Sequence, residues 1–535
     1  ESEPREWDDP RREADAGGFT THRGWLFGIC VEKGSELPKR HRLRKYKGRF
    51  VFQGNFVRDE RGQAAEFSDL SSSPATLEAG KVVDAFGLLW GNSSEQTDAE
   101  QAYTQALLKG IVTWVRLPRE YWPPSWKGME DPVVPLRLAL YGHPDAGGYW
   151  ERHCETALKS VGFSPVPQWK SVFFHSVLGL LLMVYVDDFK MSGPVANLAK
   201  GWQLIKSRIN TDEPAPVNRC LGCEHKVRRV QGPNGFRKEI EYDMEDFMGD
   251  CVKQYLNLSK VPEDSLKPVS TPFLEESAVD YVSKGTSDGR DTAKAGVLQP
   301  IACRVLMKIL YGARLARFDL LRAVAALASQ VDKWDRLCDR KLHRLVSYIK
   351  ATKGYRLRGY CGESDSMETL SLRLYADADF AGCPKTARST AGVFLALVGN
   401  DSFIPLAAVS KRQSCVSHST TEAEVVAANY AVKNGGLPAK HLWEYVLNRE
   451  VELVLREDNQ ATICVLRKGY SPNLRHLPRT HRVNVAAMGE VIDSGEVVVE
   501  YCATQDQAGD IFTKGFTNVV KWNAAIRLIG VGPRS

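Results

Sequence analysis

Two adjacent carboxylates, Asp187 and Asp188, directly follow an apolar run in the stretch LGLLLMVYVDDFKMSG, residues 178–193. A strand that ends in YVDD holds its backbone rigidly and alternates its side chains, so only one of the two acids can point fully to a given face. Carboxylates this close repel each other unless a cation lies between them, and Mg²⁺ prefers such oxygen ligands. The pair is therefore a candidate metal site, with an acidic hairpin turn as the simpler alternative.

A third acid, Asp98, occurs in TDAEQAYTQALL, after a loop that contains Gly and Ser and before a stretch that we expect to be helical. An aromatic residue, Tyr103, follows five residues later. Three carboxylates that hold two metal ions could orient an attacking hydroxyl group and stabilise a leaving pyrophosphate, which is polymerase chemistry.

Four further acids lie in the last third of the chain, on a predicted strand, a helix start, a strand end and a late helix. They could converge on two Mg²⁺ ions that position a water molecule against a phosphodiester. Exposure on a solvated surface explains any one of them more simply, but it explains the whole set poorly. The candidates are Asp377 in LRLYADADFAG, Glu422 in TTEAE, Asp458 in REDNQ and Asp510 in QAGDIFTK.

Two neighbouring acids are alternates within this set. Asp379 lies on the same strand face as Asp377, because side chains two residues apart share a face. Glu422 and Glu424 lie about 200° apart around a helix, so they cannot both face one site. Glu422 is the candidate and Glu424 is its alternate.

Composition limits the class of protein. The 535 residues, 43% of them hydrophobic, suffice for more than one buried core and exclude a disordered chain. The net charge of +6 is too small to identify a partner, but the run Lys39–Arg49 has seven Lys or Arg and no acid. Twelve irregularly spaced cysteines indicate a reduced, intracellular protein, and CLGCE with His225 and Cys251 is better explained by buried side chains than by a zinc site. The longest apolar run is about half of a membrane span.

Hydrophobic periodicity predicts an α+β chain with several parts. Residues 1–32, charged and Gly-bearing, are expected to be a linker or the end of an upstream domain. Residues 33–238 alternate β-rich runs with helical stretches such as AEQAYTQALLKG, residues 239–365 are predicted to be helical, and residues 366–535 to form a compact α/β domain. Within the last part, a helix over TEAEVVAANYAVKNGG is expected to stop at its two glycines.

The order D-x-x-x-A-Y and then YVDD resembles the palm of reverse transcriptases, and more narrowly the polymerase of copia-type LTR retrotransposons. Further stretches resemble motifs of that family in the same order. KYKGRFVFQGN (45–55), LYGHPDAGGYW (140–150) and CLGCE (220–224) resemble its finger, L-Y-G-L-K-Q and primer-contacting motifs. VSTPFLEE (269–276), LARFDLLRAVAALAS (315–329) and LVSYIKATKGYRL (345–357) resemble its thumb and connection. The resemblance implies a right-hand polymerase of fingers, palm and thumb.

This resemblance also assigns roles to single residues. Tyr103 would lie under the sugar of the incoming nucleotide and exclude a 2′-hydroxyl group. Arg49, with Lys47 beside it, would hold the triphosphate through charge-assisted hydrogen bonds. Two Mg²⁺ ions, for which Mn²⁺ can substitute, would be bound by Asp98, Ala99 through its backbone oxygen, Asp187 and Asp188.

The chain departs from the family in the L-Y-G-L-K-Q motif, where Asp145 replaces the Gln of the nucleotide-binding site and Pro144 replaces the Lys. An amide that donates to the nucleotide thus becomes an acid that would repel a triphosphate. The alternative to an active polymerase is therefore a decayed or domesticated nucleic-acid-binding copy, with an impaired polymerase and a nuclease that could still be active.

The last part resembles the ribonuclease H domain of the same elements. DADFAG, HSTTEAE, DNQ and QAGDIFTK stand where the family has D-A-D-W-A-G, S-S-T-E-A-E, D-N-Q and Q-L-A-D-I-L-T-K. LPRTHRVNV resembles its R-T-K-H-I-D stretch, and His481 within it is expected to be structural or to contact the substrate. By position, the catalytic and Mg²⁺-binding set would be Asp377, Glu422, Asp458 and Asp510.

Together these resemblances imply an RNA-directed DNA polymerase with a tethered, ribonuclease H-like α/β domain, from the C-terminal part of a copia-type Pol polyprotein. The expected partners are an RNA template, a DNA or tRNA primer, deoxynucleoside triphosphates and an RNA/DNA hybrid. The chain begins with Glu1 rather than Met, which fits a polyprotein with integrase upstream. The family implies cytoplasmic particles and the nucleus, without a membrane.

Overall fold

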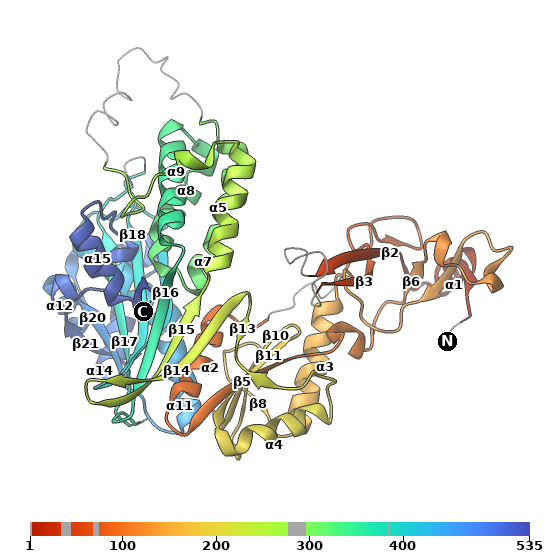
Figure 1. Cartoon of the computed structure of the whole chain (residues 1–535), viewed down its shortest axis with the longest axis horizontal. Coiled ribbons are helices and arrows are strands. Elements are labelled where there is room, and N and C mark those ends of the chain that lie inside the picture. Colours follow the sequence, from red (N-terminus) through yellow and green to blue (C-terminus); the bar gives the residue numbers. More distant parts are fainter. Residues whose placement is uncertain are drawn as a thin grey trace, which may run out of the picture.

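The computed structural model describes residues 3–33, 44–67, 74–275, 296–366, 368–383 and 386–534. The described residues form three β-sheets, which we call the N-terminal, middle and C-terminal sheets. The N-terminal sheet lies at one end of an elongated molecule, and the middle sheet lies between it and the large C-terminal part (Figure 1). Residues 39–43 of the basic run and residue 276 of VSTPFLEE lie outside the described residues.

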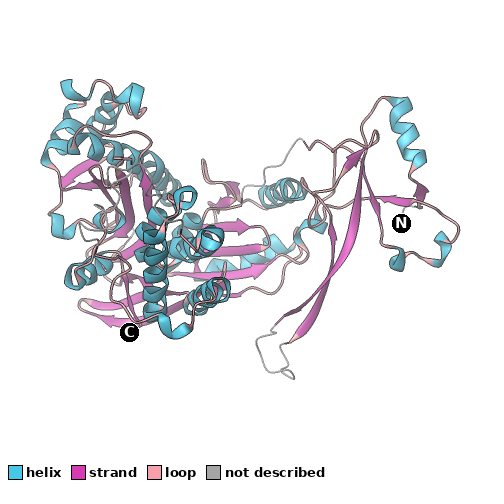
Figure 2. Cartoon of the chain, turned by 90° about the horizontal axis from the view of Figure 1, so that it is seen from above, coloured by secondary structure: helices cyan, strands magenta, loops and turns pink. Residues whose placement is uncertain are grey.

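The N-terminal sheet has the strand order β1-β7-β6-β2-β3, and β4 also pairs with β2. Its antiparallel strands β2 (His22–Lys33) and β3 (Lys45–Phe52) form a long hairpin that projects from the body (Figure 2). The other elements are β1 (Arg5–Glu6), α1 (Asp8–Gly17), β4 (Arg58–Asp59), β6 (Thr113–Arg116) and β7 (Pro132–Pro135). Of the two predictions for residues 1–32, a linker or the end of an upstream domain, the linker is wrong, because Trp7 is buried in a small core of this folded unit.

The middle sheet has the order β12-β5-β11-β10-β9-β8 and contains the apolar run as β10. Alternate residues of β10 enter different cores. Leu181 and Met183 pack with helix α2 (Leu77–Leu88), whereas Leu180 and Leu182 pack with α3 (Ala146–Ser160) and α4 (Val195–Lys206). A strand covered on both faces needs apolar residues at every position, which explains the run. The strands are β5 (Asn92–Asp98), β8 (Ser164–Pro165), β9 (Val172–His175), β10 (Leu180–Tyr185), β11 (Asp188–Pro194) and β12 (Ala215–Pro216).

The helix predicted over AEQAYTQALLKG is absent from this described part of the chain. Only one 3₁₀ turn forms there, η1 (Ala102–Gln105). The residue before it, Gln101, adopts φ +48°, and the strand β5 extends through Asp98. The left-handed conformation of Gln101, between the strand and the turn, is incompatible with a continuous right-handed helix.

The C-terminal sheet has ten strands in the order β13-β14-β15-β16-β19-β18-β17-β20-β21, and β22 also pairs with β16. The predicted border between residues 365 and 366 falls inside this sheet, because β15 pairs with β16 and β16 with β19. Its strands are β13 (Arg219–Cys220), β14 (Cys223–Gly232), β15 (Gly235–Asp243), β16 (Tyr355–Gly362), β17 (Ser371–Asp379), β18 (Thr390–Val398), β19 (Phe403–Arg412), β20 (Leu453–Glu457), β21 (Val498–Tyr501) and β22 (Val531–Pro533).

The predictions of a helical connector and of late helices agree with the structure only in part. The connector contains α5 (Glu245–Ser259), α7 (Gln299–Leu315), α8 (Leu321–Ala328) and α9 (Arg336–Thr352), which stand beside the C-terminal sheet in Figure 1. The last part contains α10 (Thr420–Ala431), α11 (Leu437–Leu447), α12 (Gln460–Lys468), α13 (Leu477–Thr480), α14 (Val485–Asp493) and α15 (Val519–Leu528). Within the described ranges, none of the helices combines the length and apolar composition needed to span a membrane.

The stop predicted at Gly435 and Gly436 is wrong. A π-helical turn, η7 (Val432–Gly436), carries the chain from α10 directly into α11. A Cβ atom at Gly436 would lie only 2.9 Å from the side chains of Leu374 and Leu453. This glycine therefore permits close packing on the sheet and does not end the helix.

A buried ionic cluster lies where α2 packs against both β11 and β15. Lys190 Nζ lies 2.8 Å from Asp84 Oδ1, and both side chains are almost fully buried. Tyr242 donates to Asp84 Oδ2 at 3.2 Å, and His225 Nε2 lies 3.3 Å from the same oxygen. Burial alone would raise the pKa of the Asp84 carboxyl, but Lys190 and His225 hold it well below its usual range. The cluster thus joins the middle sheet to the C-terminal sheet.

Replacing Lys190 by Met is expected to lower the free energy of unfolding by about 3–5 kcal/mol, because the Asp84 carboxylate then stays buried without its cation. The double variant Lys190→Met, Asp84→Leu is expected to recover more than half of this loss, since neither charge remains. Urea unfolding at neutral pH measures both effects. A Lys190→Met protein as stable as the wild type would contradict this role of the ion pair.

Candidate active sites

The first candidate site lies at the tip of the β10–β11 hairpin. Asp188 opens β11 and pairs across the sheet with Asp98, the last residue of β5. Asp187 lies in the two-residue turn between β10 and β11. Burial, and then the charges of Asp187 and Asp98, raise the pKa of Asp188 to about 7. The structure therefore brings the three predicted acids to one end of the sheet. Their oxygens are not as tightly grouped as those of the second site, where three acids lie within 4.8 Å of one another.

The turn itself is held by two hydrogen bonds to its backbone. Val186 adopts φ +59°, an uncommon conformation for a β-branched residue. Trp150 Nε1 donates to the Val186 carbonyl oxygen at 2.7 Å, and the Ala99 N–H donates to the Asp187 carbonyl oxygen at 2.7 Å. Trp150, on α3, is almost fully buried. These two hydrogen bonds thus hold a strained turn in place. Trp150 is a positioning residue, and it was given no role in the sequence analysis although it lies in the motif LYGHPDAGGYW.

Replacing Trp150 by Phe is expected to destabilise the protein by about 1–2 kcal/mol, because the partly buried Val186 carbonyl group loses its donor. If the first site is a polymerase, nucleotide incorporation is expected to slow by about 10- to 100-fold, since small displacements of reacting groups are costly. Single-nucleotide primer extension measures the rate, and cleavage of an RNA/DNA hybrid serves as the internal control. Unchanged incorporation by a folded variant would contradict this role.

Aromatic and basic residues meet beside the first site. The rings of Tyr103 and Tyr141 lie 4.5 Å apart, and the Arg49 guanidinium lies 5.5 Å from the Tyr141 ring centroid. Burial, and then Asp187, raise the pKa of both tyrosines. Lys47 is exposed on β3, on the same face as Arg49. Residues from three segments that are distant in sequence therefore lie beside the Asp187 turn. Tyr141 is one of these site residues, and it was given no role in the sequence analysis.

Asp145 lies at the start of α3, at its N-cap position. The backbone N–H of Asp145 donates to His143 Nδ1 at 3.2 Å, and His143 Nε2 lies 3.2 Å from Thr113 Oγ1. His143 is 6% exposed. Burial, and then the neighbouring His22, lower the pKa of His143 to about 4. The neutral imidazole therefore organises the backbone at Asp145.

Acid is expected to weaken this part of the fold. Because the folded-state pKa of His143 lies below its ordinary 6.5, its contribution is complete above that value and is lost as the pH falls toward 4. The full loss is about 3 kcal/mol. His143→Asn keeps an acceptor near Nδ1 and does not titrate, so its urea midpoint should fall less between neutral pH and about pH 5. Parallel pH curves for the two proteins would contradict the assignment.

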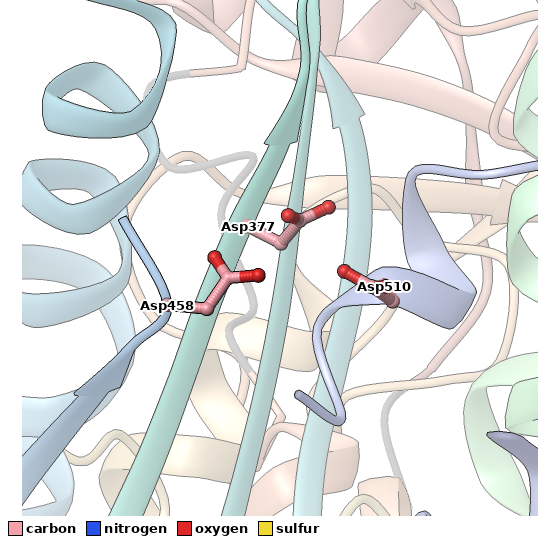
Figure 3. A group of neighbouring side chains, drawn as sticks. All are labelled: Asp377, Asp458 and Asp510. Carbon is pink, nitrogen blue, oxygen red and sulfur yellow. The ribbon is translucent and has the colours of Figure 1, made fainter. Parts of the chain in front are cut away.

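The second candidate site lies at the ends of strands in the C-terminal sheet. Figure 3 shows the carboxylates of Asp377 on β17, Asp458 after β20 and Asp510 on the short turn η10 (Asp510–Phe512) directed toward a common space. One oxygen of each lies within 4.8 Å of the others. Burial, and then Asp377, raise the pKa of Asp510. The late helix predicted around Asp510 is thus a single 3₁₀ turn, but its acid reaches the predicted cluster.

Hydrogen bonds hold these acids in position. Thr504 Oγ1 donates to Asp458 Oδ2 at 2.9 Å, and Thr513 Oγ1 donates to Asp377 Oδ2. Lys514 Nζ lies 2.6 Å from Asp510 Oδ1 and 3.6 Å from Asp377 Oδ1. Asp379, the alternate to Asp377, instead pairs with Arg322 at 3.3 Å and accepts from the Thr390 N–H. Asp377 is therefore the member of that pair that belongs to the cluster.

The structure corrects the choice between the two glutamates of α10. Glu424 is 4% exposed, and burial, followed by Asp377, Glu457 and Asp458, raises its pKa above the usual range. One oxygen of Glu424 lies within 4.8 Å of oxygens of Glu457 and Asp458. Glu424, which the sequence reasoning kept as the alternate, thus faces the site.

Glu422 faces a different part of the molecule. Its Oε1 lies 3.1 Å from His476 Nε2 and 3.3 Å from His481 Nε2, and its Oε2 accepts from the His418 N–H at 2.9 Å. Ser419 caps α10 by accepting from the Glu422 N–H. Ser419-x-x-Glu422 is thus close to a capping box, a signal in the sequence that could have assigned Glu422 to capping of the helix rather than to the site. The His481 side chain is buried beside Glu422, and its expected role, structural or substrate-contacting, stays a prediction.

Sequence comparisons relate nearly the whole chain to proteins of mobile elements. The retrovirus-related Pol polyprotein from transposon RE2 of Arabidopsis thaliana is 26% identical over 507 residues, which cover 91% of this chain and 31% of that protein. The corresponding protein from transposon TNT 1-94 of Nicotiana tabacum is 24% identical over 92% of this chain and 34% of its own length. The transposon Ty1-GR2 Gag-Pol polyprotein of Saccharomyces cerevisiae is 22% identical over 88% and 25%, respectively.

The chain therefore spans about a quarter to a third of the length of these curated relatives. No protein-family profile matches it. Each of these three comparisons covers at least 88% of the chain. In sequence, this chain is a relative of the Pol polyproteins of copia-type retrotransposons.

Proposed function

We propose that this chain is an RNA-directed DNA polymerase with a tethered ribonuclease H, a part of a copia-type Pol polyprotein with integrase in another part. The observation that carries the proposal is the presence of two separate carboxylate sites at strand ends in one chain. Its partners would be an RNA template, a DNA or tRNA primer, deoxynucleoside triphosphates and the resulting RNA/DNA hybrid.

This proposal gives each sheet a role in a right-hand polymerase. The N-terminal sheet would be the fingers, the middle sheet the palm, and helices α5, α7, α8 and α9 the thumb and connection. The part from β17 onward would be the ribonuclease H-like domain. The continuous C-terminal sheet supports a rigid link between polymerase and nuclease, since the β13–β14–β15 strands belong to it.

The acids of the first site fit Mg²⁺ or Mn²⁺, because all are hard oxygen donors and their mutual repulsion favours a cation. When bound, these ions would neutralise charge on the triphosphate and lower the pKa of the primer 3′-hydroxyl group. Asp98, Asp187 and Asp188, with the Ala99 carbonyl, would hold them. Arg49 and Lys47 would hold the triphosphate, and the Tyr103 ring would exclude a 2′-hydroxyl group.

In the second site, Asp377, Glu424, Asp458 and Asp510 would hold the metal ions and orient a water molecule toward the RNA phosphodiester. The buried Glu424 oxygen Oε2 has no hydrogen-bond partner, which supports a cation there. Lys514, beside Asp510 and Asp377, would keep these acids in place and offer a positive charge next to the phosphate.

Primer extension tests the first activity. The wild-type chain is incubated with poly(rA)/oligo(dT), dTTP and Mg²⁺, and hybrid cleavage is followed separately with labelled RNA. Extension together with RNA cleavage is the expected result. No incorporation under conditions in which the hybrid is bound and cut would remove the polymerase part of the proposal and keep the nuclease.

A second candidate function is favoured by Asp145. An acid at the start of α3, where the family has Gln, would repel a nucleotide triphosphate. The protein would then be a decayed or domesticated copy that binds nucleic acid and retains hybrid cleavage. Asp145→Gln distinguishes the two functions: it is expected to raise extension strongly if Asp145 blocks the pocket, and to leave it little changed if the wild-type pocket already functions.

A further inference from the structure

Glu457 is an acid at the second site that the sequence reasoning did not consider. It is the last residue of β20, directly before Asp458, and its side chain is fully buried. Side chains alternate along a strand, but β20 ends at Glu457, so the chain can direct Asp458 back toward the same space. One oxygen each of Glu424, Glu457 and Asp458 lies within 4.8 Å of the others.

Two oxygens of this group lack a partner. Glu457 Oε1 accepts from the Asn459 N–H at 3.1 Å, but Glu457 Oε2 is buried without a hydrogen bond. Glu424 Oε2, on the facing helix α10, is also buried without one. Buried polar atoms in proteins are nearly always paired, so two unpaired carboxylate oxygens in one small space indicate a missing positively charged group.

The residues that the structure describes supply no such group. Within the described part of the chain, no lysine, arginine or histidine forms an ion pair with Glu424 or Glu457. Lys514, a cation at the second site, pairs with Asp377 and Asp510. Three carboxylates this close repel one another unless a cation is shared among them.

We propose that Glu457 is a fifth acidic metal ligand, which with Glu424 and Asp458 holds a divalent cation beside the group Asp377, Asp458 and Asp510. Asp458 belongs to both groups and would bridge the two ions. The all-carboxylate donor set suits Mg²⁺ or Mn²⁺. The inference deepens the proposed nuclease and rests on it for the biological role of the cation, but not for the cation site itself.

Mn²⁺ binding tests the proposal without relying on activity. The full chain carrying Asp187→Asn and Asp188→Asn, which weakens the first site, is titrated with Mn²⁺ alone, and the free ion is followed by electron paramagnetic resonance. Glu457→Gln in this background is expected to raise the Kd of one Mn²⁺ by about tenfold or more. Glu424→Gln should do the same, whereas Glu422→Gln, an equally buried glutamate of α10, should leave binding within about twofold.

Unchanged Mn²⁺ binding by Glu457→Gln, with weakened binding by Glu424→Gln, would overturn the proposal and leave Glu457 a buried acid of the core. If Glu457→Gln does not fold, Glu457→Asp replaces it: withdrawal of the oxygens by one methylene should weaken binding, and unchanged binding would again overturn the proposal. Hybrid cleavage by the wild type separates the two hypotheses. Mn²⁺ held through Glu457 without cleavage would remove the nuclease and keep the cation site.

Discussion

Primer extension on an RNA template is expected to fall by about 10³-fold or more when Asp187 is replaced by Asn, while cleavage of RNA in a hybrid stays within about twofold of the wild type. Asp187 lies in the turn that carries the first site, and its neighbours Asp188 and Asp98 alone would hold a metal ion poorly. The acids of the second site lie on or beside the C-terminal sheet, and none of them belongs to that turn.

Steady-state incorporation of dTTP on poly(rA)/oligo(dT) measures the first effect, and cleavage of labelled RNA measures the second. Asp250→Asn, on the exposed side of α5, is the matched control and should change neither. Equal loss of both activities in a folded Asp187→Asn protein would contradict two independent sites. Retained extension would exclude Asp187 from the polymerase chemistry.

Substitutions of Glu424 and Glu422, two residues apart on α10, are expected to have very different effects on hybrid cleavage. Glu424→Gln should reduce hybrid cleavage by about 10³-fold, because it removes an anionic ligand from the space shared with Asp458. Glu422→Gln should keep cleavage within about threefold and lower stability by about 1–2 kcal/mol, since a buried acceptor at the start of α10 is weakened.

Both substitutions are isosteric and remove one negative charge from a buried side chain, so they control for each other. Cleavage rates with Mg²⁺ and thermal melting of both variants provide the comparison. A large loss in Glu422→Gln with normal cleavage in Glu424→Gln would return the catalytic role to Glu422, and would mean that α10 is rotated in the active protein.

Residue pattern alone predicted Asp187 and Asp188 as a candidate metal pair. The alternation of buried residues in β10 and the YVDD ending are local properties of the chain, and Asp98 could be located from the resemblance of its surroundings. Asp377, Asp458 and Asp510, which were predicted on a strand, at a strand end and in a late helix, meet one another in the structure.

Predictions from the local sequence pattern were wrong where tertiary packing outweighs the local conformational preference. The glycines at 435 and 436 predict a helix end, yet Gly436 serves close contact with Leu374 and Leu453. The charged residues before β2 predict a linker, yet Trp7 anchors them in a folded unit. In both cases, contacts with residues distant in sequence supply more free energy than the local preference.

The sequence by itself determined the kinds of element, the order of the acidic motifs and most of the carboxylates that could do chemistry, because these depend on neighbouring residues. Only the tertiary structure decided that Glu424 rather than Glu422 faces the second site, that Trp150 holds the first turn, and that Glu457 joins the acids. The physical reason is that the rotation of a docked helix and the meeting of strand ends depend on packing between residues far apart in the chain. The local hydrophobic periodicity of the sequence does not reveal this packing.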